Sequence, residues 1–146
     1  MSHKAQQTAW DRHVALLMGK GSLTGGAIVP ILPGTASSAA RKNVIHAQKG
    51  LSLRVPEAVA LVDSVMDGKV HKDYVYLGGQ QYMVTTVTES AYYGKAMSVT
   101  APGGCAIVKT AELLIVATFA SPVVAAEAIP QVHRFCDQLA TMIGQL

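Results

Sequence analysis

His133 and Cys136 are the two side chains whose types and spacing come closest to covalent chemistry. They stand three residues apart, so a helix would place the imidazole and the thiol on one face, as a base and its nucleophile require. Such a pair usually also needs a third group that orients the base, and a pocket for the substrate. Ordinary packing and surface roles explain the two residues better, so we expect no catalytic residue and no enzyme activity.

Motifs of other enzyme and cofactor sites are missing from the sequence. It contains no Gly-x-x-x-x-Gly-Lys-Ser/Thr phosphate loop, no Gly-x-Gly-x-x-Gly after a strand and no Gly-x-Ser-x-Gly. Its two cysteines exclude a disulfide framework and a four-cysteine zinc site, and free buried thiols explain them better than a single bridge. The five histidines show no metal-ligand spacing. We therefore predict neither a metal nor a cofactor.

The charge of the chain is modest and dispersed. The 146 residues include 12 Lys and Arg against nine Asp and Glu, a net charge of +3, and half of them are hydrophobic. This composition excludes a disordered chain and does not indicate binding to nucleic acid. Solvation of the surface explains the scattered basic residues. A second interpretation is that Lys95 and Lys109, on neighbouring strands, share a sheet face that meets an acidic partner.

Hydropathy predicts a cytosolic protein without a transmembrane segment. The first residues lack an apolar signal segment. The uncharged stretch over residues 113–126 is shorter than the roughly 17–25 residues of a membrane helix. No internal repeat or linker divides the chain, so we expect a single domain over residues 1–146.

Hydrophobic periodicity predicts helices at both ends of the chain and one in its first half. Apolar residues at three- and four-residue spacings mark helices over residues 5–18 and 56–66, the second opened by Pro56 and Glu57. A last helix runs to about residue 143; because of Pro130, it begins near Ile129 or has distorted first turns. Glycine turns and alternation predict a loop over 33–42 and strands over 26–31, 44–48, 74–77, 81–88, 91–99, 106–109 and 113–119. Strands joined by short turns imply an antiparallel meander, and hence an α+β fold with helices packed on the sheet.

The succession of motifs resembles profilins. Residues 77–84 (Leu-Gly-Gly-Gln-Gln-Tyr-Met-Val) are similar to the family's Leu-Gly-Gly turn and the strand after it. The pair Gly94-Lys95, residues 103–110 and residues 134–139 resemble its next two strands and its C-terminal helix. In the N-terminal half, Trp10 and residues 23–29, 45–48 and 55–57 match more loosely. The resemblance covers nearly the whole chain in the right order.

This resemblance implies a profilin-like fold: a central antiparallel sheet with the N- and C-terminal helices on one face and a further short helix on the other. It also implies a monomer of the cytoplasm and cytoskeleton that binds monomeric actin and regulates its polymerisation. Proline-rich segments of actin nucleators would bind separately, between the terminal helices. Some profilins bind phosphoinositides, to which Lys95, Lys109 and Arg134 would contribute here.

By the same resemblance, the proline-peptide site consists of Trp10, His13, His46 and Gln138. Profilins usually place large aromatic side chains at these positions, because flat rings with polar edges suit a polyproline II helix. Only Trp10 of the four keeps such a side chain. Histidine and glutamine supply less apolar area, so we expect weak or altered binding of proline-rich peptides.

The resemblance places the actin-binding residues on the later strands and at the start of the last helix. Two lysines keep basic positions there, and complementary charge would speed the encounter with acidic actin. Gln81 and Tyr93 replace basic residues of the family at two other positions, which predicts a low affinity for actin. Extra residues near 33–42 and 96–102 also depart from the family pattern, and the second insertion lies beside this surface. The implied set is Gln81, Tyr93, Lys95, Lys109, Val123, Val124, Glu127 and Gln131.

A second interpretation of the same architecture stays open. Small domains with helices on an antiparallel sheet also serve as small-ligand or haem-binding modules and as dimeric scaffolds. If His13 and His46 lie close together, they would line a ligand pocket instead of a peptide groove. A bound coloured cofactor or a stable dimer would favour this interpretation.

Overall fold

The computed structural model describes residues 3–19, 22–31, 45–66, 74–100, 102–110 and 112–144. The loop predicted over residues 33–42 lies outside these ranges. The order of helices and strands in the described chain is the predicted one, with three helices and seven strands.

The seven strands form one antiparallel sheet in the order β2-β1-β7-β6-β5-β4-β3. Strands β3 to β7 follow one another as a meander, as the short turns predict. The first strand pairs with the last strand of the meander and carries the second at its other edge. The strands are β1 (Gly25–Pro30), β2 (Ala47–Lys49), β3 (Tyr74–Leu77), β4 (Gln80–Val87), β5 (Ala91–Ala96), β6 (Gly103–Lys109) and β7 (Leu113–Ala120).

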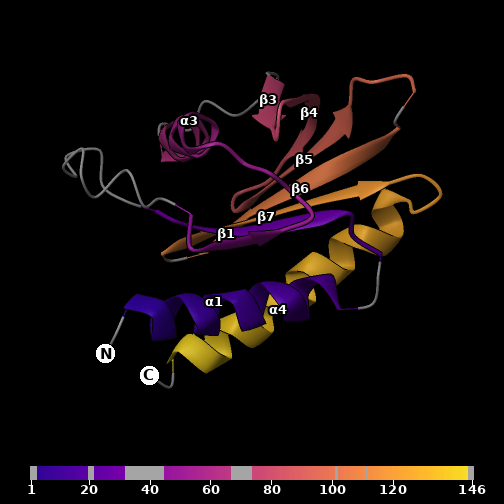
Figure 1. The fold of residues 1–146 in the computed structure, drawn as a ribbon. Helices are drawn as coiled ribbons and strands as arrows, with labels where there is room; N and C mark the ends of the chain where they lie inside the picture. Colours follow the sequence, from indigo (N-terminus) through magenta and orange to yellow (C-terminus); the bar gives the residue numbers. More distant parts are fainter. Residues whose placement is uncertain are drawn as a thin grey trace.

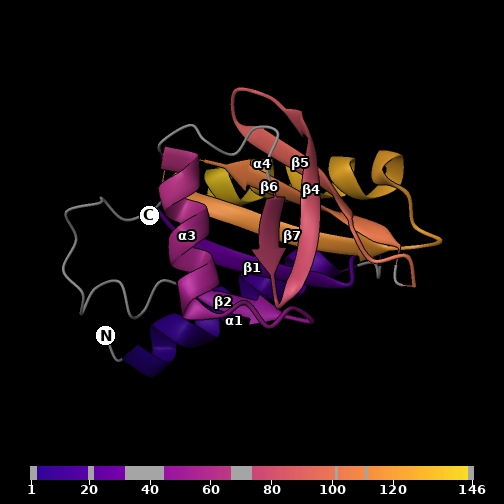
Figure 2. The same cartoon turned by 90° about the horizontal axis from the view of Figure 1, so that it is seen from above.

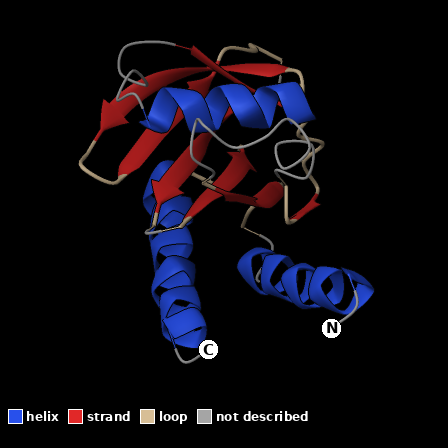
Figure 3. Ribbon diagram, turned by 90° about the vertical axis from the view of Figure 1, so that its left-hand side faces the viewer, coloured by secondary structure: helices blue, strands red, loops and turns tan. Residues whose placement is uncertain are grey.

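Helices cover both faces of this sheet. Helices α1 (His3–Met18) and α4 (Ala125–Gly144) lie together on one face, and α3 (Val55–Met66) lies on the other (Figure 1). Figure 3 shows the same division from the side, with both chain ends on the face opposite α3. The predicted fold class is therefore confirmed.

Each face of the sheet carries its own hydrophobic core. Leu17 and Val132 from the terminal helices pack against Ile115, whereas Leu61 of α3 packs in the core that contains Ile107. Strand β7 is buried on both faces, which explains why residues 113–119 form an unbroken apolar run. Strand β3, at the edge of the sheet, alternates exposed and buried residues instead.

Helix α4 begins at Ala125, so of the two predicted alternatives the start near Ile129 is wrong. The carbonyl of Val124 accepts two backbone N–H bonds of the first turn, which starts the helix ahead of the proline. Pro130 is exposed within the helix. Its ring nitrogen deprives only the carbonyl of Ala126 of its helical donor, a cost that the buried face of the helix offsets.

Three strand boundaries also differ from the prediction by three residues each. Strand β2 begins at Ala47, and β5 ends at Ala96, where residues up to 99 were expected in the strand. Strand β6 begins at Gly103, where a turn was predicted. A Cβ on Gly104 would lie 2.6 Å from the ring of Phe119, so the glycines here serve close strand contact as well as the turn.

Lys95 and Lys109 lie on opposite faces of the sheet, so the shared face predicted for them is wrong. The β5–β6 register pairs Lys95 with Gly104, which precedes Lys109 by five residues. An odd number of residues along a strand turns the side chain to the other face. Lys95 therefore lies on the face of the terminal helices, and Lys109 shares the α3 face with Ile107.

Candidate functional site

The predicted proline-peptide residues meet around Trp10, on the side of the molecule where α1 lies over β2. The rings of Trp10 and His46 stack with centroids 4.3 Å apart and planes within 5° of parallel. His13, one turn along α1, meets the edge of Trp10 at 5.5 Å and 64°. We call Trp10, His13 and His46 the aromatic cluster.

His46 is held in place by a backbone hydrogen bond and is half-buried. The backbone N–H of His46, which lies just before β2, donates a hydrogen bond of 2.9 Å to the carbonyl of Ile28. Burial lowers the pKa of the His46 imidazole below 6.5, because the charged ring would lose hydration. The stacked ring is therefore neutral at pH 7, and one face of Trp10 is already covered.

Gln138 is separate from this cluster. Its side chain is exposed on α4, and within the described ranges it has no ring contact or hydrogen bond with the three rings. The structure thus brings three of the four predicted residues together.

A second candidate surface lies on strands β3 to β5, on the face opposite α3. Val75, Leu77, Tyr82 and Val84 point into the α3 core, so the alternate residues of β3 and β4 point the other way. The terminal helices pack mainly on β1, β2, β6 and β7, which leaves this part of the face open. We call its side chains the β3–β5 face: Tyr74, Tyr76, Gln81, Met83, Tyr93, Lys95 and Met97.

The register arranges the β3–β5 face in rows across the strands. Tyr74 pairs with Met83, which pairs with Lys95, and Tyr76 pairs with Gln81. The Met97 N–H donates to the carbonyl of Gln81 at 3.0 Å, which extends the second row beyond β5.

The face is apolar and accessible. Exposed fractions are 46% for Tyr74, 54% for Tyr76, 38% for Met83 and 43% for Met97. Neighbouring exposed apolar side chains of this kind are typical of a protein-binding surface.

A hydrogen bond ties this face to α4. The Tyr93 hydroxyl and His133 Nε2 are 2.5 Å apart, and the two rings meet edge to face at 6.0 Å. Burial, and then the neighbouring Cys136, raise the pKa of the Tyr93 phenol, so it stays protonated at neutral pH. The bond fixes β5 against the terminal helix and so extends the face onto α4.

The predicted residues of α4 divide between the surface and the interior. Val124 (59% exposed) and Glu127 are accessible on the first turn. Val123 packs partly into the core beneath the terminal helices. Gln131 donates from Nε2 to the carbonyl of Leu17 at 3.0 Å, so it joins the two terminal helices.

Sequence reasoning missed five side chains of this region: Tyr74, Tyr76, Met83, Met97 and His133. The alternation of Tyr-Val-Tyr-Leu in β3 was a usable signal, because one face of that strand had to be exposed and aromatic. The contact of His133 with Tyr93 joins residues 40 apart in the chain and left no local signal.

The cysteines are poor nucleophiles. Cys105 and Cys136 are free and buried, and burial raises the pKa of each thiol to about 12. His133 Nε2 is engaged by Tyr93 rather than by Cys136. Within the described residues, no three His, Cys, Asp or Glu side chains are grouped as metal ligands, and no helix is long and apolar enough to cross a membrane.

Comparisons with known proteins agree on one family. The family model described as Profilin matches residues 8–143. A comparison with curated proteins finds no match.

Among solved structures, profilin from Schizosaccharomyces pombe matches at a TM-score of 0.74 and 22% identity, over 91% of this chain and 98% of that one. LokiProfilin1 in a complex with rabbit actin matches at 0.65 and 15%, over 97% and 98%. Mouse profilin IIa, in a complex with a double repeat from the FH1 domain of mDia1, matches at 0.65 and 15%, over 91% and 97%.

Proposed function

Because this chain belongs to the profilin family, whose members are non-enzymatic actin-binding proteins, we propose that it binds monomeric actin through the β3–β5 face and the first turn of α4. By holding monomers, it would regulate actin polymerisation in the cytoplasm. The observation that carries this proposal is the open, apolar surface that runs from Tyr74 to Lys95 and on, through Tyr93 and His133, to α4.

The contact would be mainly apolar, with one cation within it. Met83 lies between Tyr74 and Lys95 in one row, so a partner that covers the row buries an aromatic ring, a thioether and a lysine stem together. Lys95 would meet an acidic group of actin and raise the rate of encounter. Val124 and Glu127 would add contacts at the start of α4.

Two residues of the predicted actin set have other positions. Lys109 lies on the α3 face, and the amide of Gln131 is bonded to α1. We leave both out of the proposed contact. Lys95 and Lys109 also cannot contact one lipid head group together, so we do not extend the proposal to phosphoinositides.

The assembly of pyrene-labelled actin tests this function, preferably with actin from the protein's own source. We expect dose-dependent suppression of spontaneous nucleation that saturates at a one-to-one complex. Suppression that is absent at tens of micromolar would reject the proposal.

Proline-rich peptide binding is a second proposal, favoured by the flat stack of Trp10 and His46. A polyproline II helix packs on such flat surfaces, but here His46 already covers one face of Trp10. A ligand must displace His46 or use the remaining surface, so we propose weak binding. Calorimetric titration with a proline-rich peptide tests it; an affinity unchanged in the Trp10→Ala variant would reject it.

A further inference from the structure

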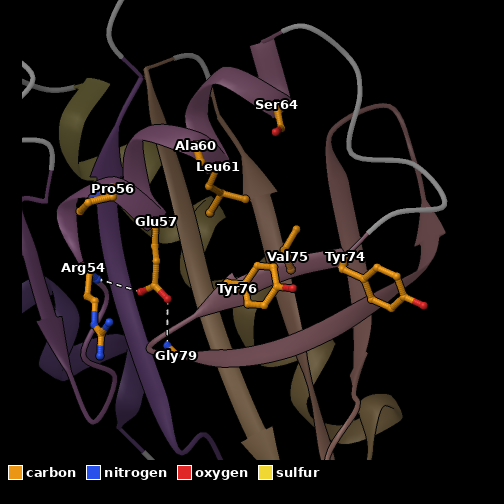
Figure 4. A pocket seen from close by; sticks show the side chains of 10 residues that line it. All are labelled: Arg54, Pro56, Glu57, Ala60, Leu61, Ser64, Tyr74, Val75, Tyr76 and Gly79. Atoms are coloured by element: carbon orange, nitrogen blue, oxygen red, sulfur yellow. Dashed lines mark hydrogen bonds between the residues drawn. The ribbon is translucent and has the colours of Figure 1, made fainter.

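A pocket lies between α3 and the edge strand β3, far from the aromatic cluster (Figure 4). It borders the β3–β5 face, because Tyr74 and Tyr76 of that face also line its rim. It encloses about 480 Å³, within the range of ligand pockets. One wall is the face of α3 that carries Leu61 and Ser64, and the other is β3 with Val75 and Tyr76. Figure 2 shows α3 running beside the sheet on the side of β3.

Glu57 fixes one end of this pocket. Its Oε1 accepts hydrogen bonds from the backbone N–H groups of Arg54 at 2.9 Å and Gly78 at 3.0 Å, and its Oε2 accepts one from Gly79 at 2.8 Å. The carboxylate thus joins the start of α3 to the β3–β4 turn, in which both glycines have positive φ. The two walls are held at a set separation, and the Glu57 oxygens are engaged by the backbone.

The outer edge of β3 has backbone groups to offer. Strand β3 is the last in the sheet, and Leu77 and Gln80 close its two-residue turn. Ladder bonds alternate in an antiparallel pair, so Val75 bonds to β4 while the N–H and C=O of Tyr76 point outward. The carbonyl of Gln81, which lies opposite Tyr76, accepts a hydrogen bond from the N–H of Met97 on the β5 side. Gln81 therefore bonds away from β3, as this alternation requires.

Among the residues that the structure describes, this edge lacks the usual protection against pairing. Natural edge strands are commonly blunted by lysine, proline or a bulge, whereas β3 reads Tyr-Val-Tyr-Leu. Leu61 and Val75 are buried in the core beneath the pocket, and the Tyr76 side chain is 54% exposed at its rim.

Arg54 supplies charge at the turn end of the pocket. Its backbone N–H is bonded to Glu57, while its guanidinium extends beside the β3–β4 turn (Figure 4). Because the Glu57 oxygens already accept three backbone N–H groups, the guanidinium is the charged group there that is available to a ligand. An anionic group would complement it.

We propose that the groove between α3 and β3 binds an extended peptide that carries an acidic residue at its first position. The peptide would pair with the N–H and C=O of Tyr76 as an added strand and place apolar side chains over Leu61 and Val75. Every other strand pair of the described sheet is antiparallel, so the N-terminal end of the peptide would lie beside Arg54. The peptide would use the outer backbone edge and the α3 side of β3, so it meets the proposed actin surface only at the rim formed by Tyr74 and Tyr76.

The charge of the peptide provides the first test. The probe is acetyl-Asp-Thr-Val-Thr-Val-Cys-amide with fluorescein attached to the cysteine sulfur, measured by anisotropy, with the matching peptide in which lysine replaces aspartate as control. The wild type should bind the aspartate peptide about tenfold more tightly, the value of one charge-assisted hydrogen bond. Arg54→Glu should reverse this order. Absence of binding of both peptides up to about 1 mM, or equal affinities that Arg54→Glu leaves unchanged, would overturn the proposal.

The backbone of Tyr76 provides the second test. Tyr76→Pro removes the outward N–H without removing a ladder bond, and Tyr76→Ala removes the same ring but keeps the N–H. Binding should fall much further in the proline variant than in the alanine variant, with circular dichroism confirming that both are folded. If the proline variant fails to fold, the charge reversal at Arg54 decides alone. Equal binding by two folded variants would overturn strand addition.

Discussion

The aromatic cluster and the β3–β5 face differ in what covers their apolar side chains. In the cluster, His46 stacks on one face of Trp10 and His13 meets its edge, so the ring that would receive a ligand is partly occupied by the protein itself. On the β3–β5 face, Tyr74 and Met83 are exposed in one row with Lys95. The same fold thus carries one surface whose aromatic area is reduced and partly used within the protein, and one that is ready to bind. This contrast favours actin over proline-rich peptides as the stronger ligand.

The largest effect is expected from a charge at the centre of the open face. Met83→Glu should weaken actin binding by about 2 kcal/mol, or about thirtyfold, because a carboxylate would be buried in an apolar contact. Titration of labelled monomeric actin measures this change. Lys49→Glu, at the opposite end of the sheet on β2, is the control and should leave the affinity unchanged. If both variants bind like the wild type, actin does not use this face.

The second effect concerns the aromatic cluster. His46→Trp should strengthen the binding of a proline-rich peptide by about 1 kcal/mol, or about fivefold, because the larger indole restores apolar area beside Trp10. Calorimetry with the same peptide measures the gain, and actin affinity should not change. A weaker affinity in this variant would mean that the imidazole itself recognises the ligand.

An effect of similar size, on stability instead of ligand binding, should come from the bond that joins the β3–β5 face to α4. Tyr93→Phe removes the hydroxyl that meets His133, and we expect a loss of about 1 kcal/mol of unfolding free energy. Thermal unfolding should show a decrease of about 3 °C. Thr85→Val, which removes an exposed hydroxyl bond on the same sheet, is a matched control with a smaller expected change. Equal shifts in the two variants would show that the Tyr93 bond contributes nothing special.

The smallest effect is a dependence of the unfolding free energy on pH, caused by His46 of the aromatic cluster. Burial depresses the pKa of His46, so below pH 6.5 the unfolded chain binds a proton that the folded chain resists. Stability from this group is complete above pH 6.5 and is lost as the pH falls toward the folded pKa. Urea unfolding at several pH values should show a shallower acid slope for His46→Phe than for the wild type. An identical slope would show that His46 does not contribute to the pH dependence of stability.

Local pattern predicted most of the fold. Alternation and glycine turns gave the meander, and Pro56 with Glu57 marked the start of α3. The faces of Lys95 and Lys109 were mispredicted because the face on which a strand residue lies depends on the register between strands. A shift of one residue in register turns each side chain to the other face, and the sequence alone does not fix the register to one residue. The start of α4 was left open between two alternatives, because a proline past the first turn costs little more than one backbone bond and need not end a helix.

The sites were harder to predict than the fold. Family resemblance brought Trp10, His13 and His46 together, but the near-parallel stack that closes the cluster is a matter of side-chain geometry. Glu57 was expected to stabilise the first turn of α3, yet it also binds the turn at Gly78 and Gly79, over 20 residues away. Contacts of this kind depend on how distant segments meet, and no local pattern encodes them.

Hydrogen exchange of the protein with and without monomeric actin tests the central claim most directly. We expect slower exchange in β4, β5 and the first turn of α4, with no change at β2 and the start of α1. Protection confined to the aromatic cluster, or no protection at actin concentrations of tens of micromolar, would contradict the assignment of the open face to actin.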